Sequence, residues 1–555
     1  MPALIVRNNI AVENYLREHP FARIGKVLSG GYIIIYVPED KVDTIAQEIG
    51  IAPTSSYPLV VGLMGKEALD ISGITQVQQQ PFLNLTGRGV LLGFIDTGID
   101  YTKEAFRYED DTSKVQFIWD QTADGPAPSG YPFGTEYTND QINQALKSPD
   151  PFSIVGQRDT VGHGTFLASV AAGREKGEYM GAAPDAELIV VKLRKAGSFF
   201  QNYFLVPESQ ENVFETGSVM MGIEYILDKA VQLNRPVAIC ISVGTNLSGH
   251  DGFNIFEEYI SRISHRPGVT ICCAAGDEGN ARHHTQGTIA KTGDIQKIQI
   301  SVGENAGSFL QSIWNNASDR ISIAVTSPTG EVVGRIPAKN GTFFTERLIL
   351  ERSTVKVGYY FPIEGSGSQL TSVRIIDATP GIWTISIYGD IIIDGRYHAW
   401  LPITGFVHPS VAYLSPSPNT TVVVPAAATG DITVGAYNSL DKSLYAASSW
   451  GPNRLMVSLP DLTAPGVEVM GTTITGHGRM EGTSVAAAVT SGACALLLQW
   501  GIVERNEPTL NTYLARAYLI RGCDRDPGLE YPNYQWGYGR LNLINTFNSL
   551  RRTQG

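Results

Sequence analysis

The sequence lacks the features that mark membrane, secreted and nucleic-acid-binding proteins. No stretch comes near the ~20 consecutive apolar residues of a membrane-spanning helix. The N-terminal MPALIVRNNIAVENYLREHP has neither the basic start nor the small-residue cleavage site of a secretory signal. The formal net charge of −12 argues against nucleic acid as a partner. We therefore expect a protein that is made and kept inside the cell and binds neither membrane nor nucleic acid.

Cysteine is also scarce, and its spacing suggests no special chemistry. The chain has five cysteines, which lie mostly in apolar runs: Cys240, Cys272, Cys273, Cys494 and Cys523. They do not have the short, regular spacing of zinc ligands. Reduced, buried thiols are therefore expected, and neither a disulfide framework nor a metal site is indicated.

The composition is that of a compact, loop-rich enzyme. Charged residues make up 17% and apolar residues 43% of the 555 residues, and 58 are glycine. A single hydrophobic core stops growing at about 250–300 residues, so a chain of this length is expected to hold two or three domains.

The first of these is predicted to be a small α+β module over residues 1–62. The strand-like GGYIIIYVPED is followed by the helical KVDTIAQEIG, and ALIVRNNIAVENYLREHP offers the same order before it. A module of about 60 residues has a marginal core that gains stability by docking on something larger. We therefore interpret residues 1–62 as a prosegment.

From about residue 85, short apolar strands alternate with helices. The strands read GVLLGFIDTG, AELIVVKL, VAICISVG and VTICCAAG. Continuous apolar strands predict a parallel sheet with helices on both faces, and active sites in such sheets gather at the carboxyl ends of the strands. Helical signals vanish over 286–412, where alternating strands predict an all-β insert. The α/β domain is therefore divided into residues 63–285 and 413–555.

Three stretches carry residues suited to nucleophilic catalysis: IDTGID with Asp96, VGHGT with His163 and EGTSVAAA with Ser484. A hydroxyl becomes a nucleophile when a base takes its proton, and an acceptor must hold that base in the right tautomer. Each residue also has a structural interpretation, as a turn cap, a core histidine and a helix cap. All three together, each at a strand end or helix start, favour the catalytic interpretation.

These stretches resemble the subtilisin-like serine proteases. GVLLGFIDTGID, DTVGHGTFLASVAAG, AAGDEG and GTSVAAAVTSGACALL match the aspartate, histidine, oxyanion and serine blocks of that family, in its chain order of Asp, His and Ser. The resemblance covers residues 85–285 and 415–545. The short prosegment, the position of the β insert and the missing signal peptide further resemble the clostridial germination (Csp) subtilases, in which the insert is a jelly-roll domain.

The resemblance implies a subtilisin-like α/β fold and a serine endopeptidase. It makes Ser484 the nucleophile, His163 the general base and then acid, and Asp96 the residue that orients His163. Asp100 is the rival carboxylate, one turn past the catalytic position of the motif. No cofactor is required for this chemistry. Calcium sites occur in the wider family, so a structural calcium ion stays open, but no acidic cluster here has convincing ligand spacing.

The resemblance also implies where a substrate binds. ISVGT matches the edge segment of the family, so Ser242, Val243 and Gly244 are expected to pair with an extended substrate by strand addition. Gly276 is expected to line the P1 slot. Glu278 is expected at the rim of that slot, where it either favours a basic P1 side chain or remains a solvated charge without a role.

The segment AGSFFQNYFLVPESQENVFETG stands where the family usually has a short substrate-contacting loop. Its four closely spaced aromatic residues are Phe199, Phe200, Tyr203 and Phe204. We expect them to pack on the prosegment or the insert, because exposed aromatic patches reduce solubility. The alternative is that they build apolar substrate subsites.

The oxyanion block departs from the family pattern. The family usually has Asn where this chain has Asp277, and that amide donates a hydrogen bond to the oxyanion. An ionised carboxylate has no proton to donate and repels the developing charge, whereas a protonated one donates. We expect Asp277 and the N–H of Ser484 to serve the oxyanion. The alternative is that Asp277 turns away, and that Asn280 or the Ser484 N–H alone takes this role.

The predicted function follows from the Csp resemblance, since active members of that branch process a spore cortex-lytic zymogen. We expect a narrow-specificity processing protease, cytoplasmic or spore-associated, whose partners are a protein or peptide substrate and its own prosegment. The main alternative is a weakly active or pseudoprotease-like protein that binds a germinant or a partner. The complete triad argues against that alternative and Asp277 argues for it. A constitutive degradative protease shares the triad but does not need the insert.

Overall fold

A computed structural model describes residues 1–48, 57, 60–63, 71–175 and 179–551. Its centre is an eight-stranded sheet in the order β27-β26-β14-β12-β5-β10-β6-β7. All neighbours are parallel except β6 and β7. The strands are β5 (Leu91–Asp96), β6 (Val115–Asp120), β7 (Thr135–Thr138), β10 (Glu187–Lys192), β12 (Val237–Ile241), β14 (Val269–Ala274), β26 (Ile432–Asn438) and β27 (Leu462–Val467).

Helices cover both faces of this sheet, as the apolar strands predicted. Successive side chains of a strand point to opposite faces, so Leu92 and Phe94 of β5 belong to one core and Leu91 and Ile95 to the other. The first core includes side chains of α6 (His163–Ala172), α10 (Thr483–Leu498), α11 (Thr512–Gly522) and α12 (Leu543–Arg551), and the second includes side chains of α8 (Thr216–Leu233) and α9 (Ile255–Ile263). The α/β subtilisin-like fold class is therefore confirmed.

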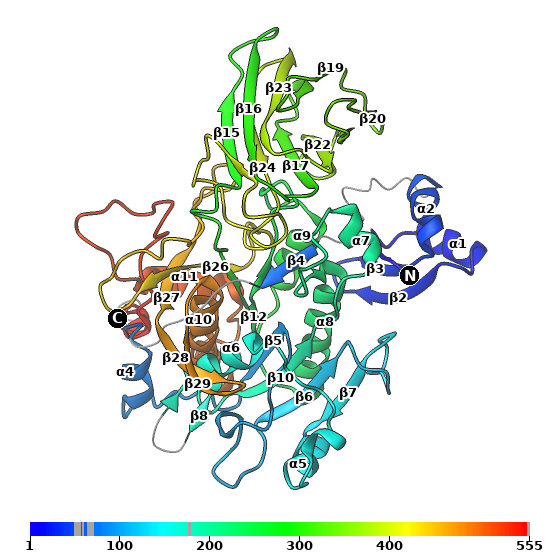
Figure 1. The fold of residues 1–555 in the computed structure, drawn as a ribbon. Helices are drawn as coiled ribbons and strands as arrows, with labels where there is room; N and C mark the ends of the chain where they lie inside the picture. The colour runs from blue at the N-terminus through cyan, green and yellow to red at the C-terminus, as the bar shows by residue number, and fades with distance from the viewer. Residues whose placement is uncertain (49–56, 58–59, 64–70, 176–178, 552–555) are drawn as a thin grey trace.

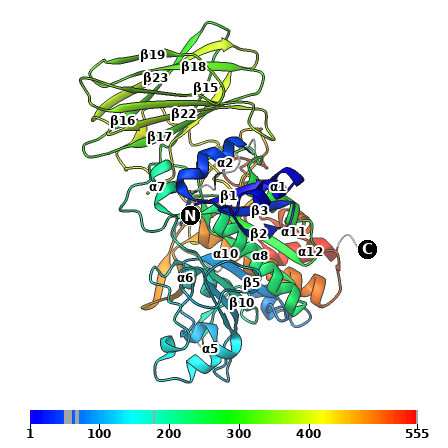
Figure 2. The ribbon, with the colours of Figure 1, turned by 90° about the vertical axis from the view of Figure 1, so that its right-hand side faces the viewer.

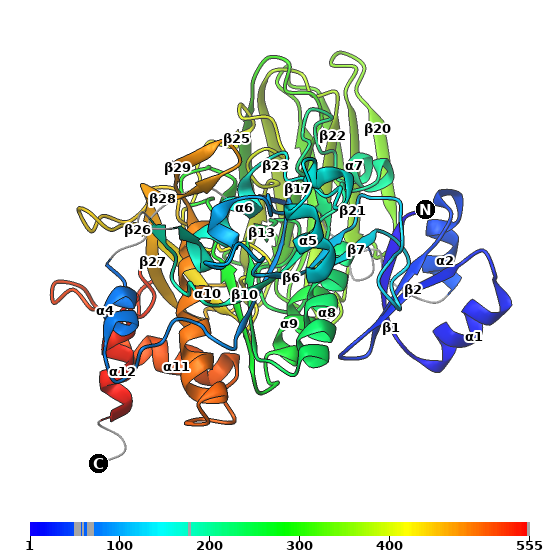
Figure 3. The same cartoon turned by 90° about the horizontal axis from the view of Figure 1, so that it is seen from below.

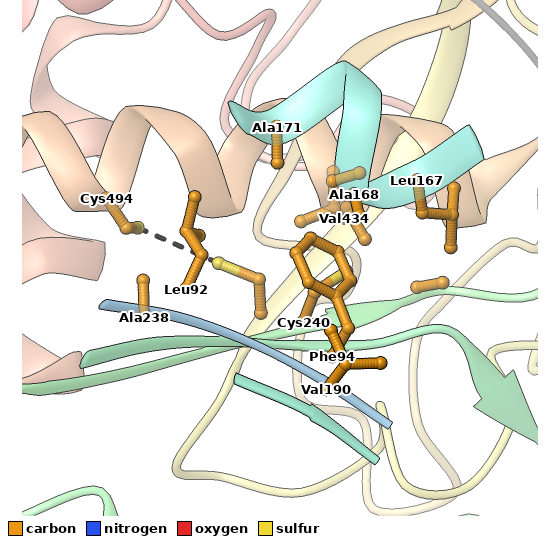
Figure 4. Close-up of a cluster of buried hydrophobic side chains, with 14 of the residues drawn as sticks. Leu92, Phe94, Leu167, Ala168, Ala171, Val190, Ala238, Cys240, Val434 and Cys494 are labelled. Carbon is orange, nitrogen blue, oxygen red and sulfur yellow. Dashed lines mark hydrogen bonds between the residues drawn. The ribbon is translucent and has the colours of Figure 1, made fainter. Parts of the chain in front are cut away.

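The first core is apolar throughout and contains cysteine side chains (Figure 4). Cys272 of β14 and Cys494 of α10 approach each other, with their sulfur atoms 3.7 Å apart. All five cysteines are free and buried, as predicted. Burial raises the pKa of the Cys240 thiol to about 12, so this thiol stays protonated and unreactive.

The segment Thr483–Val503, which contains α10, is long and apolar enough to cross a membrane by length and composition alone. However, 89% of its most apolar window is buried inside the protein. The central helix of a folded core passes the same test. The helix α10 carries Ser484 in its first turn, and its buried apolar side chains hold this residue against the core.

The N-terminal module packs against α8 and α9 (Figure 3). It contains an antiparallel sheet in the order β1-β3-β2 and two helices. Its elements are β1 (Ala3–Arg7), α1 (Ile10–Glu18), β2 (Arg23–Leu28), β3 (Tyr32–Tyr36) and α2 (Val42–Glu48). Basic residues of the module face acidic residues of α8 and α9. Arg7 contacts Glu258 of α9 at 3.0 Å, and Lys26 contacts Asp228 of α8 at 3.2 Å.

Residues 284–413 contain strands and no helix, and they form a separate lobe (Figures 1 and 2). Two antiparallel sheets, β15-β24-β17-β22-β21-β20 and β19-β18-β23-β16-β25, enclose a core of their own. The strands are β15 (His284–Thr288), β16 (Ile295–Val302), β17 (Phe309–Asn315), β18 (Arg320–Thr326), β19 (Val332–Ile336), β20 (Phe343–Arg347), β21 (Thr354–Tyr360), β22 (Gln369–Ile376), β23 (Gly381–Ile391), β24 (Arg396–Trp400) and β25 (Ala412–Tyr413).

The aromatic segment after residue 197 packs in the way that the solubility argument favoured. Phe199, Phe200 and Tyr203 of α7 (Ser198–Tyr203) lie edge-on around Tyr57, at 6.4, 5.7 and 5.1 Å between ring centroids. On the insert side, the Arg374 guanidinium lies 4.1 Å from the centroid of the Tyr203 ring. The segment therefore joins the N-terminal part of the chain to the insert.

A histidine cluster lies where the insert meets the α/β domain. His250, His284 and His398 surround Trp400, and the imidazoles of His284 and His398 are 3.1 Å apart at Nε2 and Nδ1. Burial lowers the pKa of His250 to about 4 and that of His398 to about 3, and it also lowers the pKa of His284. These side chains are therefore neutral in the folded protein at physiological pH.

The cluster predicts that acid destabilises the protein. Histidines whose folded pKa is depressed contribute their full stability above the unfolded value of about 6.5, and each loses about 1.4 kcal/mol per pH unit below it. Replacing His398 by Gln removes one such group, so urea unfolding between pH 7.5 and 5 should show a shallower loss of stability than in the parent. The exposed His265→Gln variant is the control and should keep the parental slope. Equal slopes for all three proteins would contradict the assignment.

Candidate active site

The three predicted catalytic residues lie at the ends of secondary-structure elements in the α/β domain. Asp96 is the last residue of β5, His163 the first of α6 and Ser484 the second of α10. Gly162, directly before α6, has φ of +89°, which glycine adopts without strain. It lets the chain turn sharply so that His163 begins the helix while its ring reaches the end of β5.

Asp96 and His163 form a buried pair. The Nδ1 atom of His163 lies 2.9 and 2.8 Å from the two carboxylate oxygens of Asp96. Ser242 Oγ donates to Asp96 at 2.5 Å and the N–H of Thr97 donates at 2.7 Å. Burial alone would raise the pKa of Asp96, but His163 and the two donors outweigh it and hold this pKa below its ordinary value. A proton on Nδ1 of His163 is thus held by a carboxylate, which leaves Nε2 as the basic nitrogen.

Ser242 connects this pair to Ser484. The hydroxyl of Ser484 donates to the backbone carbonyl of Ser242 at 3.4 Å, while the hydroxyl of Ser242 donates to Asp96. Both serines are fully buried, with 1% or less of Ser242 and Ser484 exposed. The role of Ser242 as a support for Asp96 was not predicted, because the motif indicates only its backbone.

The rival carboxylate, Asp100, has a local structural role. It accepts hydrogen bonds from the N–H and the hydroxyl of Thr102 at 3.1 and 2.6 Å, which stabilises a turn. Its side chain also lies 3.4 Å from Lys103. These contacts agree with the choice of Asp96 over Asp100.

Asp277 faces the start of α10. Its Oδ1 atom accepts hydrogen bonds from the N–H and the hydroxyl of Thr483, both at 3.1 Å. The Thr483 hydroxyl in turn accepts from the N–H of Gly276 at 3.1 Å. The carboxyl group therefore lies one residue from the nucleophile, at a helix N-terminus that attracts negative charge. Asn280, the alternative oxyanion donor, is exposed.

The predicted edge strand is paired with a segment of the same chain. Val243 and Gly244 form β13 (Val243–Gly244), which runs antiparallel to β4 (Val60–Leu63). The other edge of β4 pairs with β11 (Phe214–Glu215). One extended segment therefore lies between two strands of the α/β domain, in the manner expected for a substrate backbone.

Gly276 has φ of +103°, and a Cβ atom there would lie 2.6 Å from the Val423 side chain. Backbone freedom and lack of space therefore both require glycine at this position. Gly276 lies in the turn that follows β14, residues 275–280, which is called the oxyanion turn below. There it packs against the segment around Val423. Its contribution to a P1 slot stays a prediction.

Glu278 lines a hollow beside Asp277, but its side chain is buried. It is 4% exposed, and its two carboxylate oxygens contact Thr404, His283 and Asn246. A solvated charge is therefore the wrong description of this residue, since main-chain and side-chain donors surround it. The predicted preference for a basic P1 side chain stays a prediction, without a free carboxylate oxygen to support it.

Among the residues that the structure describes, no group of three or more His, Cys, Asp and Glu side chains is arranged to hold a metal ion. The acidic residues near the site instead accept hydrogen bonds from the chain. The expectation that the chemistry requires no cofactor, and the open question of a structural calcium ion, both remain as predictions.

Comparison with known proteins identifies the class to which this fold and site belong. The family model "Subtilase family" matches residues 87–330 and 413–539, on both sides of the insert. The chain therefore belongs to the subtilase family.

A solved structure places it more closely within that family. The CspB protease of Clostridium perfringens is 31% identical, with a TM-score of 0.77, and the match covers 86% of this chain and 98% of the other. The chain is thus a Csp-like subtilase.

Curated relatives are more distant. The intracellular serine protease of Paenibacillus polymyxa is 23% identical over 275 residues, 49% of this chain and 66% of its own length. The PII-type proteinase of Lacticaseibacillus paracasei is 23% identical over 494 residues, 77% of this chain and 23% of its own length. This chain therefore spans about a quarter of the length of such proteinases.

Proposed function

We propose that this chain hydrolyses peptide bonds with Ser484, His163 and Asp96 as a catalytic triad, and that it acts as a narrow-specificity processing protease. The observation that carries the proposal is the hydrogen-bonded series from His163 through Asp96 and Ser242 to Ser484. It supplies a base oriented by a carboxylate and a buried hydroxyl at a helix start, which are the parts that acyl transfer needs.

In the proposed reaction, the Ser484 oxygen attacks the scissile carbonyl carbon while His163 Nε2 takes the hydroxyl proton. The carbonyl oxygen becomes the oxyanion of a tetrahedral intermediate. His163 then gives its proton to the leaving amine, and an acyl-enzyme remains on Ser484. Water repeats the two steps: it attacks the ester carbon and passes a proton to His163, which then gives that proton to the Ser484 oxygen as the bond to the acyl group breaks and the carboxylic acid product leaves. Asp96 stabilises the imidazolium in both halves and keeps its own charge.

We further propose that residues 1–62 are an inhibitory prosegment. The strand β4 supports this, since it fills the position of a substrate backbone between β11 and β13. We expect the chain to cut itself once around residues 53–70. This region lies mostly outside the described residues, which here are Tyr57 and Val60–Leu63. A partner zymogen of the germination type and a cytoplasmic or spore-associated location are proposals that rest on the likeness to a CspB protease.

The alternative of a weakly active or pseudoprotease-like binding protein rests on one observation. Asp277 carries a carboxyl group bound to Thr483, one residue from Ser484, at the position where the family usually has an oxyanion-binding Asn. A protease that makes few cuts in one partner tolerates such a loss of rate. Hydrolysis of a peptide by the purified protein, absent in the Ser484→Ala form, tests the main proposal against this alternative.

Replacing Asp277 by Asn should raise kcat/KM on a peptide substrate roughly tenfold or more at neutral pH, because a missing oxyanion donor costs about 10²–10³ in turnover. The amide oxygen still accepts from Thr483, and the amide N–H gains the ability to donate. The gain should be largest on the alkaline side, where a carboxyl group holds its proton least.

Asp277→Ala is the control for this variant, since it removes the charge without adding a donor. Its rate should fall between those of the parent and Asp277→Asn. If Asp277→Asn were slower than the parent, or equal to it at every pH, the carboxyl group would not be the oxyanion partner.

A further inference from the structure

Glu278, the neighbour of Asp277, is a buried carboxylate with every oxygen engaged. Its Oε1 atom accepts the N–H of Thr404 at 2.8 Å. Its Oε2 atom lies 2.7 Å from His283 Nδ1 and accepts from Asn246 Nδ2 at 3.3 Å. Its own N–H donates to Ser449 Oγ at 3.0 Å. Such pairing is what a buried charge requires. It fixes the Glu278 side chain beside the hollow that it helps to line.

These partners come from separate parts of the fold. His283 directly precedes β15, where the chain enters the insert, and Thr404 follows β24, where it returns. Asn246 lies two residues past the edge strand β13 and also donates to the Leu401 carbonyl at 3.2 Å. The Glu278 carboxylate therefore contacts the segment that enters the insert, the segment that leaves it, and the loop that follows β13.

The same turn is held from its other side by the helix that carries the nucleophile. The Gly276 N–H donates to the Thr483 hydroxyl and the Asp277 carboxylate accepts from the Thr483 N–H, each at 3.1 Å. The oxyanion turn thus lies between the start of α10 and the connections of the insert. A hollow beside Asp277 is lined in part by Ile403 and Pro409, so the returning chain also reaches the surface that a substrate would meet.

We propose that Glu278 is a positioning residue through which the β insert holds the oxyanion turn in register with Ser484. The inference rests on the proposed serine protease function and adds a role for the insert in it. Loss of this carboxylate should then affect the rate of the chemical step more than substrate binding, because displacement of reacting groups by about 1 Å costs up to about 10²-fold in rate.

The test compares Glu278→Gln with a matched variant of another buried carboxylate. An amide has one acceptor oxygen, so glutamine cannot accept from Thr404, His283 and Asn246 together. Asp319 in the insert is 1% exposed and accepts the main-chain N–H groups of residues 393–395 at 2.7, 2.9 and 2.6 Å. Asp319→Asn therefore weakens the insert without touching the turn.

The expected result for Glu278→Gln is a fall in kcat of about 10–100-fold on a peptide substrate, with KM changed less than about threefold. Asp319→Asn should keep kcat while its melting temperature falls. His283→Asn, which keeps a donor for Glu278, should retain most of the rate, and His283→Leu should lose as much as Glu278→Gln.

An unchanged kcat in Glu278→Gln, or equal losses in Glu278→Gln and Asp319→Asn, would overturn the positioning role. So would equal rates for His283→Asn and His283→Leu. These outcomes differ from a failure of the proposed function, in which the parent protein itself cuts no peptide.

Discussion

Ser484→Ala should lower kcat on a peptide substrate about 10⁶-fold, because the reaction then lacks its nucleophile and only the residual catalysis by the remaining groups is left. The parent chain should be cut once near its N-terminus, and the Ser484→Ala chain should remain at full length by intact mass. Both measurements report the activity of the Ser484 hydroxyl, the first on an added peptide and the second on the chain itself.

The residues of the triad act as a unit, so their losses should not add. His163→Ala is expected to cost about as much as Ser484→Ala, and the double variant no more than either. Ser491→Ala is the matched control, since Ser491 is equally buried on the same helix α10 and should leave the rate near that of the parent. Equal cutting of the parent and Ser484→Ala would assign the cut to a protease of the expression host.

The α/β core was predictable because its strands are covered on both faces. A strand buried in that way is apolar at nearly every position, as β5 and β14 are, and the end of the apolar run then indicates where the strand ends. The same argument located Asp96 and Asp277, since each follows such a run. By contrast, β2 (Arg23–Leu28) was missed because it is mostly exposed and mixes charged residues with glycine.

Contacts between distant parts of the chain were not predictable in the same way. Ser242 supports Asp96 across 146 residues, and Glu278 binds Thr404 across 126. Local periodicity carries no information about such pairs, because each partner alone looks like an ordinary polar residue near a turn. The resemblance therefore indicated a substrate-facing Glu278. In the structure, one carboxylate oxygen accepts from Thr404 and the other contacts His283 and Asn246.

Asp96→Asn should lower kcat about 10⁴-fold and change KM little, a smaller loss than those of Ser484→Ala and His163→Ala. Asparagine fits the space, but its amide can donate to His163 Nδ1 and so favour the tautomer with the proton on Nε2. That nitrogen then cannot accept the proton of Ser484. In the parent, His163 and Ser242 hold the pKa of Asp96 below its ordinary value despite burial. The carboxylate therefore stays ionised to lower pH than an ordinary aspartate.

Asp100→Asn provides the comparison that makes this assignment decisive. Asp100 lies in the same motif and is bound to Thr102 and Lys103, so its replacement should change kcat by less than about threefold while costing some stability of the turn. Both variants keep size and shape, and they differ only in which carboxylate is removed. A larger loss of kcat in Asp100→Asn than in Asp96→Asn would transfer the orienting role to Asp100. Equal small losses would mean that His163 is held in its tautomer by a group other than these two carboxylates.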